Sequence, residues 1–300
     1  MRRLAPSKTF LVGEYAVLQQ SPAVLMSTGP HFEAKYSCVK PHTDQSQLGA
    51  INMDSPTGRY LHDLGLHGDD IHFVDPHQGK GGFGASTAQF LLAYLSINNI
   101  NSLNEIDHSD LLNTYRTYHY SGKGLAPSGA DLIGQLHGQI TVYYPSTQDI
   151  RTLRWPFPEL RLNLLHTGNK VATHEHLASL SSIDTQRLTP IIHSTIQALE
   201  TADQTQFLLS INAYANALQT ASYTHPISSD LLDKLEAESF MRAAKPCGAL
   251  GADVLLVITD VDRQDDLLRW CADHSISFVA DDSMISDGAI TTRSNADVVR

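Results

Sequence analysis

Apolar and polar residues alternate along residues 31–38, and this period-two pattern predicts a half-buried strand. Residues 139–144 show the same pattern. Between them, residues 86–97 carry apolar side chains at helical spacing, directly after the glycine-rich residues 81–84. The sequence therefore predicts a glycine loop that opens a helix.

The second half of the chain shows a different order of elements. Residues 161–165 predict a strand, and the stretch that follows, to about residue 222, has mainly helical periodicity. Residues 253–259, 264–274 and 276–280 predict a strand, an amphipathic helix and another strand. This β-α-β pattern indicates that the second half is of the mixed α+β class.

The length of 300 residues exceeds the usual size of one compact core, so we expect two lobes in one chain. The change in pattern places the first lobe at residues 1–165 and the second at residues 166–300. No repeat with a period of about 20 to 50 residues is present, which disfavours a solenoid or a propeller.

Composition narrows the class of protein. The formal net charge of −11 repels polyanions and no basic run offsets it, so we expect no nucleic-acid partner. No apolar run approaches the roughly 20 residues of a membrane span, and the N-terminus lacks a secretory signal. Cys38, Cys247 and Cys271 are widely spaced, which predicts three thiols. We expect a cytoplasmic protein without a membrane partner, either a monomer or a homodimer.

Lysine is scarce, with eight residues in the whole chain. Those that lie in or near glycine-containing segments are Lys8, Lys80, Lys123, Lys170 and Lys245. This clustering predicts a positive pocket on an otherwise acidic protein.

Residues 80–88 read Lys-Gly-Gly-Phe-Gly-Ala-Ser-Thr-Ala. Glycines leave backbone N–H groups accessible, and a helix N-terminus adds a positive dipole end, so this combination suits a bound phosphate. A serine hydroxyl there, Ser86, can also reach a magnesium ion. The segment lacks the Gly-Lys-Ser/Thr ending of a Walker loop and the preceding apolar strand of a Rossmann fingerprint. Taken alone, it is either a phosphate site or a helix cap.

Three further segments combine small residues with a charged one. Residues 5–8 (Ala-Pro-Ser-Lys) predict a turn before a strand, with Lys8 either exposed or part of a site. Residues 127–131 (Pro-Ser-Gly-Ala-Asp) place Asp131 just beyond a Ser-Gly turn, where an aspartate is often a helix cap. Residues 245–253 predict a small-residue loop that a tight turn would explain equally well.

The four segments, in this order along nearly the whole chain, resemble the signature regions of the GHMP kinase superfamily. Residues 5–8 and 13–17 resemble its opening, Ala-Pro-Gly-Lys followed by Gly-Glu-Tyr/His-Ala-Val, and the glycine loop resembles its Gly-Leu-Gly-Ser-Ser-Ala phosphate loop. Residues 128–131 match Ser-Gly-x-Asp, and residues 248–253 match Gly-Ala-Gly-Gly-Asp. The resemblance implies a two-lobed α+β fold, with an N-terminal phosphate-loop domain, a C-terminal ferredoxin-like domain and an active site between them.

Within this superfamily, two features resemble the phosphomevalonate kinase family. Asp253 stands where that family carries Asp and mevalonate kinases carry Gly. Residues 167–173 (Thr-Gly-Asn-Lys-Val-Ala-Thr) resemble its Thr-Gly-x-Pro-Ala-Ser-Thr segment. The chain departs from the superfamily pattern with Ser7, Leu250 and Ala252 for glycines, Ala85 for the first serine of the phosphate loop, and Cys247 for a Ser/Thr.

The resemblance implies a role for each matched residue. Lys8 and Asp131 are implied as catalytic residues that face the acceptor, and Ser86 as a ligand of Mg²⁺. The implied ATP-binding residues are Lys80, Gly81, Gly82, Gly84, Ala85, Ser86 and Thr87. The implied acceptor-binding residues are Glu14, Tyr15, Ser128, Gly129, Lys170, Gly248, Ala249 and Asp253.

The reaction implied by the resemblance is ATP-dependent phosphorylation of 5-phosphomevalonate to 5-diphosphomevalonate, in the mevalonate route to isoprenoids. The expected ligands are then MgATP and a small phosphorylated or alcohol acceptor. A mevalonate kinase or another kinase for small alcohols is one alternative. The second alternative is a non-catalytic protein of the same fold, which would bind a ligand without turnover.

Overall fold

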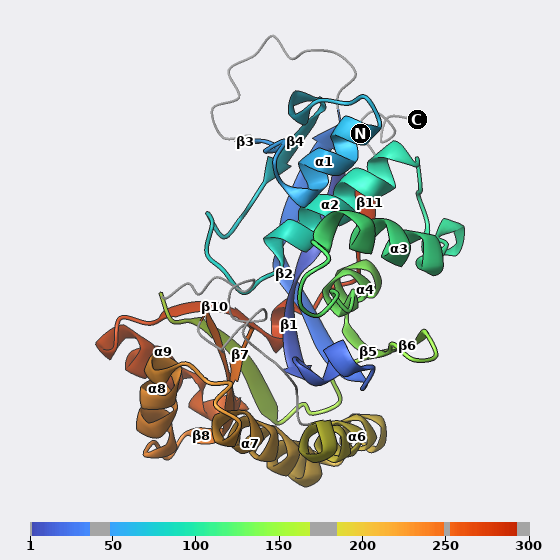
Figure 1. Cartoon of the computed structure of the whole chain (residues 1–300). Coiled ribbons are helices and arrows are strands. Elements are labelled where there is room, and N and C mark those ends of the chain that lie inside the picture. Colours follow the sequence, from blue (N-terminus) through green and yellow to red (C-terminus); the bar gives the residue numbers. More distant parts are fainter. Residues whose placement is uncertain (1, 37–48, 169–184, 249–252, 293–300) are drawn as a thin grey trace, which may run out of the picture.

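The computed structural model describes residues 2–36, 49–168, 185–248 and 253–292 (Figure 1). Two β-sheets lie one above the other in this view, and each has helices packed against it. Strand β1 (Arg2–Val12) belongs to the upper sheet and extends down to the smaller one. The two sheets therefore approach each other near the end of β1.

The larger sheet has seven strands within the described residues, in the order β11-β1-β2-β4-β3, with β5 next to β2 and β6 next to β5. Its remaining strands are β2 (Ala23–Tyr36), β3 (Gly49–Ala50), β4 (Ile71–Val74), β5 (Ile140–Tyr144), β6 (Asp149–Leu153) and β11 (Ile290–Thr292). The strand predicted at residues 139–144 is confirmed as β5. The described part of residues 31–38 lies in β2, which begins earlier than predicted.

The predicted turn at residues 5–8 is wrong, because β1 continues through this segment. The pairing of β1 with β2 shifts register between Ala5 and Ser7. Pro6 lies at this shift, and a proline has no N–H group to donate to the neighbouring strand, so an irregularity is needed there. The proline thus marks a bulge within a strand rather than its beginning.

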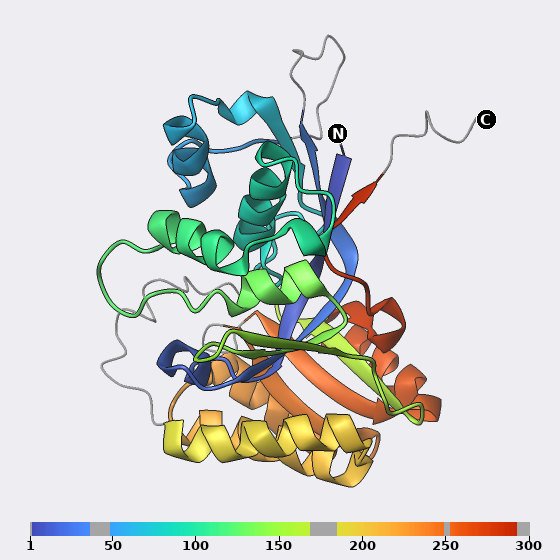
Figure 2. The same cartoon turned by 90° about the vertical axis from the view of Figure 1, so that its right-hand side faces the viewer.

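Four helices of the described chain accompany the larger sheet: α1 (Pro56–Asp63), α2 (Ala85–Ile97), α3 (His108–His119) and α4 (Ala130–His137) (Figure 2). The helix predicted at residues 86–97 is confirmed as α2. All six residues from 90 to 95 are buried, so α2 is enclosed on every side rather than amphipathic. It lies between the sheet and the helices α1 and α3, because Phe90 contacts rings on both of these helices.

The smaller sheet has the order β10-β7-β9-β8 within the described residues, and its neighbouring strands are antiparallel. Its strands are β7 (Leu160–His166), β8 (Met241–Cys247), β9 (Val254–Asp260) and β10 (Ser277–Asp281). The predicted strand-helix-strand at residues 253–280 is confirmed as β9, α9 (Gln264–Asp273) and β10, with β7 between the two strands. This order is that of a ferredoxin-like sheet, as predicted.

Alternate residues of β7 and β9 point to opposite faces of the smaller sheet. One set packs into the main core together with the larger sheet: Leu162, Leu164, Leu256 and Ile258. The other set forms a second core with α8 (Pro226–Glu236) and α9: Leu165, Leu255 and Val257. The smaller sheet is therefore covered on one face by helices and joined to the larger sheet on the other.

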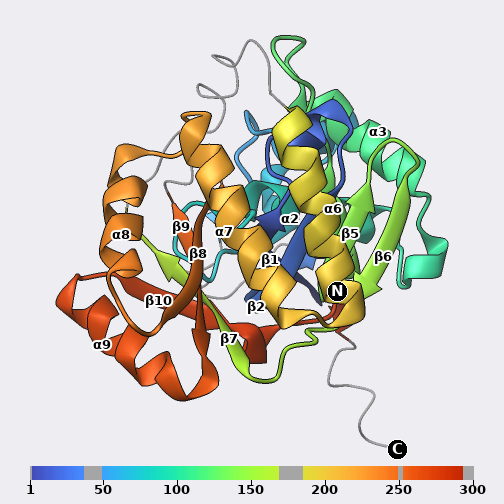
Figure 3. The same ribbon diagram turned by 90° about the horizontal axis from the view of Figure 1, so that it is seen from below.

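Helices α6 (Thr185–Thr201) and α7 (Gln204–Thr220) form the helical stretch predicted after β7. They lie side by side across the molecule when it is seen from below (Figure 3). Helix α7 contacts both β8 and β1, so it packs against both sheets. No helix in the described ranges has the length and apolar character to cross a membrane.

The proposed division at residue 165 remains a prediction. Strand β7, which ends at His166, belongs to the smaller sheet, whereas β11 returns to the larger sheet and pairs with β1. Two of the predicted thiols, Cys247 and Cys271, are free and buried. Cys38 lies outside the described residues.

Candidate active site

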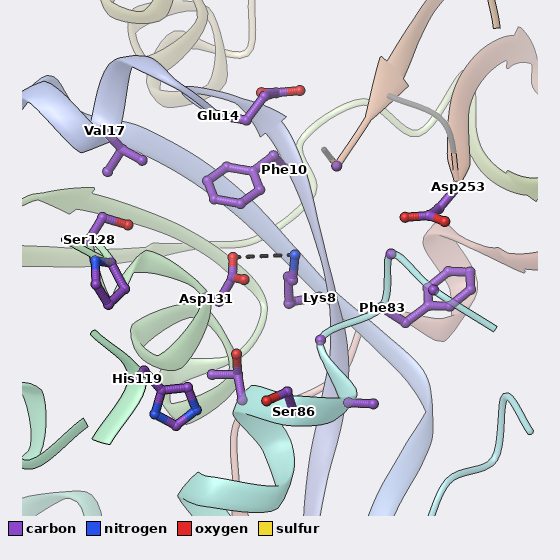
Figure 4. Close-up of a pocket in the computed structure, with 18 of the residues that line it drawn as sticks. Lys8, Phe10, Glu14, Val17, Phe83, Ser86, His119, Ser128, Asp131 and Asp253 are labelled. Atoms are coloured by element: carbon purple, nitrogen blue, oxygen red, sulfur yellow. Dashed lines mark ion pairs between the residues drawn. The ribbon is translucent and has the colours of Figure 1, made fainter. Parts of the chain in front are cut away.

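A pocket of about 450 Å³ lies where β1, the glycine loop, α3, α4 and the two residues Gly248 and Asp253, next to the ends of β8 and β9, meet (Figure 4). It brings together all the predicted site residues that the structure describes: Lys8, Glu14, Tyr15, Lys80, Gly81, Gly82, Gly84, Ala85, Ser86, Thr87, Ser128, Gly129, Asp131, Gly248 and Asp253. The predicted acceptor-binding residues Lys170 and Ala249 lie outside the described residues. Segments that are far apart in the sequence thus form one site.

Lys8 and Asp131 form an ion pair in the middle of this pocket (Figure 4). The Lys8 Nζ atom lies 3.2 Å from Asp131 Oδ1 and 5.2 Å from the centre of the Phe10 ring. Lys8 is only 6% exposed, so the alternative of a solvent-exposed lysine is wrong. A buried ammonium group with one carboxylate partner is suited to stabilising a further negative charge.

Asp131 stands in the first turn of α4, where the positive end of the helix dipole stabilises a carboxylate. The cap residue of this helix is Gly129, in the left-handed conformation with φ of 81°. The alternative that Asp131 is the helix cap is therefore wrong. Arg116 on α3 donates hydrogen bonds to the carbonyls of Pro127 and Ser128, and these bonds hold the preceding loop in place.

The glycine loop ends at Gly84, which caps α2 with φ of 87°. A Cβ atom at Gly84 would lie 2.9 Å from Lys8 Cγ, so glycine allows the loop to approach β1 closely. The Lys8 N–H donates to the Phe83 carbonyl over 3.1 Å, which ties the loop to the strand. The first hydrogen bond inside α2 comes from Ala88, so the N–H groups of residues 85–87 are available to an anion.

The Asp253 side chain approaches the glycine loop from the smaller sheet. A Cβ atom at Gly81 would lie 2.6 Å from Asp253 Oδ1 and 2.9 Å from Asp253 Cγ. The Asp253 carbonyl also accepts a hydrogen bond of 3.0 Å from the Thr167 N–H. Asp253 therefore joins the start of β9 to both the glycine loop and the segment after β7.

The sequence resemblance implies an MgATP site here, and on that expectation Gly81→Ala should weaken MgATP binding about tenfold, because the new methyl group overlaps the Asp253 carboxylate and displaces the loop. Adding Asp253→Gly removes the overlap and should restore most of the affinity. Gly49→Ala is the matched control, because a methyl group there meets nothing closer than 3.9 Å. Calorimetric titration with MgATP measures the effect, and equal affinity of Gly81→Ala and the wild type would refute it.

Glu14 and Lys245 form a buried ion pair at one wall of the pocket. Lys245 Nζ lies 2.5 Å from Glu14 Oε1 and 3.2 Å from the Phe10 carbonyl oxygen. Lys245 has no exposed surface and sits on β8 rather than in the predicted loop at residues 245–253. Burial raises the pKa of the Glu14 carboxyl, and Lys245 opposes this effect. The pair joins the end of β1 to the smaller sheet.

The prediction of a positively charged pocket is wrong for the lining that the structure describes. Its charged residues are the cations Lys8 and Lys80 and the carboxylates Glu14, Asp75, Asp131 and Asp253. Lys245 is neutralised by Glu14, and Lys123 does not line the pocket. With the Glu14–Lys245 pair set aside, the described lining still carries three carboxylates and two lysine cations.

Sequence reasoning missed several lining residues, and these are Phe10, Val17, Leu18, Asp75, Gly79, Phe83, Tyr115, His119 and Pro127. Tyr115 and His119 stand one turn apart on α3, and their rings stack with centroids 4.0 Å apart. Asp107 at the N-cap, followed by Leu111 and Leu112, could have predicted α3. Nothing in the spacing predicts that this helix faces the pocket.

The oxygen donors in the pocket suit a magnesium ion that is bound together with phosphate. Mg²⁺ favours one or two protein oxygens plus substrate phosphates and water. The hydroxyl of Ser86 and the carboxylate of Asp131 both line the pocket and are donors of this kind. No group of three or more His, Cys, Asp or Glu side chains in the described residues could hold a metal ion by itself. These oxygen donors therefore suit a metal ion that binds together with a phosphate group.

Comparison with solved structures shows the fold. Mevalonate kinase of Methanococcus jannaschii has 14% identity and a TM-score of 0.71, over 96% of this chain and 98% of that one. Phosphomevalonate kinase of Streptococcus pneumoniae, in complex with phosphomevalonate and AMPPNP, has 16% identity and a TM-score of 0.70, over 94% and 99%. Galactokinase of Lactococcus lactis, complexed with galactose, has 12% identity and a TM-score of 0.70, over 96% and 94%.

At the level of sequence, no protein-family model matches the chain, and no curated protein matches it. The structural likeness nevertheless covers almost the whole length of both partners in each comparison. The protein therefore has the two-lobed α+β fold of GHMP kinases.

Proposed function

We propose that the protein transfers the γ-phosphoryl group of ATP to a small-molecule acceptor in this pocket. The observation that carries the proposal is the ion pair between the buried Lys8 and the partly exposed Asp131, which lies beside the N-terminus of α2 (Figure 4). The free N–H groups of residues 85–87 would bind ATP phosphates, together with the other residues of the loop from Lys80 to Thr87. The acceptor would lie on the side of Lys8 and Asp131.

Phosphoryl transfer has a loose transition state with charge spread over the equatorial oxygens, so positioning and charge stabilisation supply most of the catalysis. In our proposal, Lys8 stabilises this charge, and Asp131 orients Lys8 through the ion pair of 3.2 Å. Ser86 and the phosphates would hold Mg²⁺, which when bound neutralises negative charge on the transferring group. The first-turn amides of α2 add fixed dipoles that need no reorganisation.

We further propose 5-phosphomevalonate as the acceptor and 5-diphosphomevalonate as the product. Asp253 and the segment that begins at Thr167 support this choice, since both resemble phosphomevalonate kinases, and the Thr167 N–H donates to the Asp253 carbonyl. A protein of the same fold was solved with phosphomevalonate and AMPPNP bound. The proposed acceptor-binding residues remain Glu14, Tyr15, Ser128, Gly129, Lys170, Gly248, Ala249 and Asp253.

Mevalonate is the second candidate acceptor, and the charge of the pocket favours it. The described lining carries more carboxylates than cations, which suits an alcohol better than a phosphomonoester dianion. An alcohol must lose a proton, so Asp131 would then act as a general base. A phosphomonoester has a second pKa near 6 and is largely dianionic at neutral pH, so it needs no base.

The variant Asp131→Asn distinguishes between the two candidate acceptors. With 5-phosphomevalonate we expect measurable turnover, reduced about tenfold to a hundredfold, because the asparagine still contacts Lys8. A coupled assay of ADP release, with mevalonate and 5-phosphomevalonate offered side by side to the wild type and the variant, measures this. Wild-type turnover with mevalonate alone, lost completely in Asp131→Asn, would refute the phosphorylated acceptor. Absence of ADP release by the wild type with both acceptors would refute the proposed function.

A further inference from the structure

Beside the pocket, Ser7 and His77 are joined by a hydrogen bond that no motif predicts. Ser7 Oγ lies 2.6 Å from His77 Nε2, and it also donates to the Pro30 carbonyl over 2.9 Å. Both side chains are buried, with His77 6% exposed and Ser7 1% exposed. Ser7 is the residue that precedes Lys8 on β1.

The partners of Ser7 determine the tautomer of His77. A serine hydroxyl has one proton, and the Pro30 carbonyl oxygen can only accept, so the Ser7 proton points to Pro30. Ser7 Oγ must therefore accept from His77, which requires a proton on Nε2. Burial, which Asp75 partly opposes, lowers the pKa of His77 to about 4, so the ring is neutral at physiological pH.

The His77 ring in turn holds Phe83 of the glycine loop. Their ring centroids are 4.1 Å apart with planes at 16°, which is a stacked arrangement. His166, at the end of β7, stacks on Phe83 as well, at 5.9 Å. Phe83 is 1% exposed, and its carbonyl accepts the hydrogen bond from the Lys8 N–H. Phe83 is thus fixed by its ring and by its backbone.

The backbone around His77 is held equally firmly. Asp75 Oδ1 accepts from the His77 N–H over 2.8 Å, and Asp75 Oδ2 accepts from the Gly79 N–H over 2.9 Å. The Lys80 N–H donates to the His77 carbonyl over 3.1 Å. These bonds give His77 a defined place at the beginning of the glycine loop. Its side chain connects this turn to β1 and to Phe83.

We propose that Ser7 and His77 are positioning residues that hold the glycine loop against Lys8. Through Phe83 they fix the place of Gly84 and of the first turn of α2, where the ATP phosphates bind if the proposed function is right. The Ser7–His77 hydrogen bond then helps to set the distance from the catalytic ammonium group to the phosphate-binding amides, together with the bond from the Lys8 N–H to the Phe83 carbonyl. The inference rests on the proposed function, because it assigns these residues to the same nucleotide site.

Calorimetric titration with MgATP tests the proposal in the absence of any acceptor. We expect Ser7→Ala and His77→Phe each to weaken binding about tenfold, since each leaves a buried partner without its hydrogen bond. The double variant should bind no more weakly than the weaker single variant, because both changes remove the same interaction. The control is Thr141→Val on β5, which removes the buried hydrogen bond of 2.8 Å from the Thr141 hydroxyl to the Gly138 carbonyl at the end of α4. This control should lower the melting temperature but leave MgATP affinity unchanged.

Equal MgATP affinity of Ser7→Ala, His77→Phe and the wild type, with only a lower melting temperature, would overturn the inference while leaving the proposed function intact. Failure of the wild type to bind MgATP would overturn both. Nitrogen-15 NMR of the wild-type histidines gives a readout that needs no variant to fold. We expect His77 to be neutral at pH 7 with its proton on Nε2, and a proton on Nδ1 instead would contradict the inferred direction of the hydrogen bond, because Nε2 would then accept from the Ser7 hydroxyl.

Discussion

Lys8→Met is expected to reduce the rate of phosphoryl transfer at least about 10³-fold while the protein remains folded. The ammonium group is buried in the pocket beside the proposed path of the phosphoryl group, and methionine supplies a stem of similar length without the charge. Its partner Asp131 keeps 32% of its side chain exposed, so the carboxylate stays partly in contact with water when the lysine is gone, although its Oδ1 atom is buried. The loss should therefore appear in kcat rather than in folding.

Lys35→Met makes the same chemical change away from the pocket and serves as the control. Lys35 pairs with Glu33 over 3.3 Å at the surface, with 49% of its side chain exposed, and such pairs contribute little. ADP release reports activity, and circular dichroism with urea unfolding reports the fold. A Lys8→Met protein that retains turnover close to that of Lys35→Met would contradict the role of Lys8.

Lys245→Met is expected to lower the free energy of unfolding by about 3–5 kcal/mol, because it leaves the Glu14 carboxylate buried without its partner. All three donors of the Lys245 ammonium group are used, by Glu14 Oε1, the Phe10 carbonyl oxygen and Cys247 Sγ. The Tyr214 hydroxyl donates to the Glu14 carbonyl over 2.8 Å, so the backbone of Glu14 is also hydrogen-bonded to α7. The loss should be larger than for any surface ion pair in the described chain.

Adding Glu14→Gln to Lys245→Met removes the unpaired charge, so the double variant should recover more than half of the lost stability. Urea unfolding of the single and double variants measures this. Lys234→Met is the control, because Lys234 pairs with Asp230 on the surface of α8, and its loss should cost less than about 0.5 kcal/mol. A double variant that is less stable than Lys245→Met alone would show that the charge is not the cause.

Much of the pocket could be predicted because its segments depend on local conformation. Gly84 and Gly129 adopt positive φ at the start of α2 and α4, and such positions can be recognised in the sequence as glycines before helices. The order of these segments carried the resemblance to GHMP kinases, and that fold brings them together. Fifteen of the predicted site residues line one pocket for this reason.

The features that escaped prediction depend on contacts between distant segments. Glu14 and Lys245 are separated by 231 positions, and no local pattern shows that the second residue neutralises the first. The position of β7 between β9 and β10 was implied by the resemblance to a ferredoxin-like domain and not by any local pattern. His77 has no motif of its own, and its role emerges only when its ring is placed between Ser7 and Phe83.

Phosphorus-31 NMR of the wild-type protein with MgATP and 5-phosphomevalonate is the most direct test of phosphoryl transfer, because it observes the transferred group rather than the release of ADP. We expect the phosphomonoester signal to disappear and the signals of ADP and of a new diphosphate ester to grow in equal amounts. Unchanged ATP and phosphomonoester signals, together with unchanged ATP when mevalonate is the acceptor, would contradict the account and favour a protein that binds its ligands without turnover.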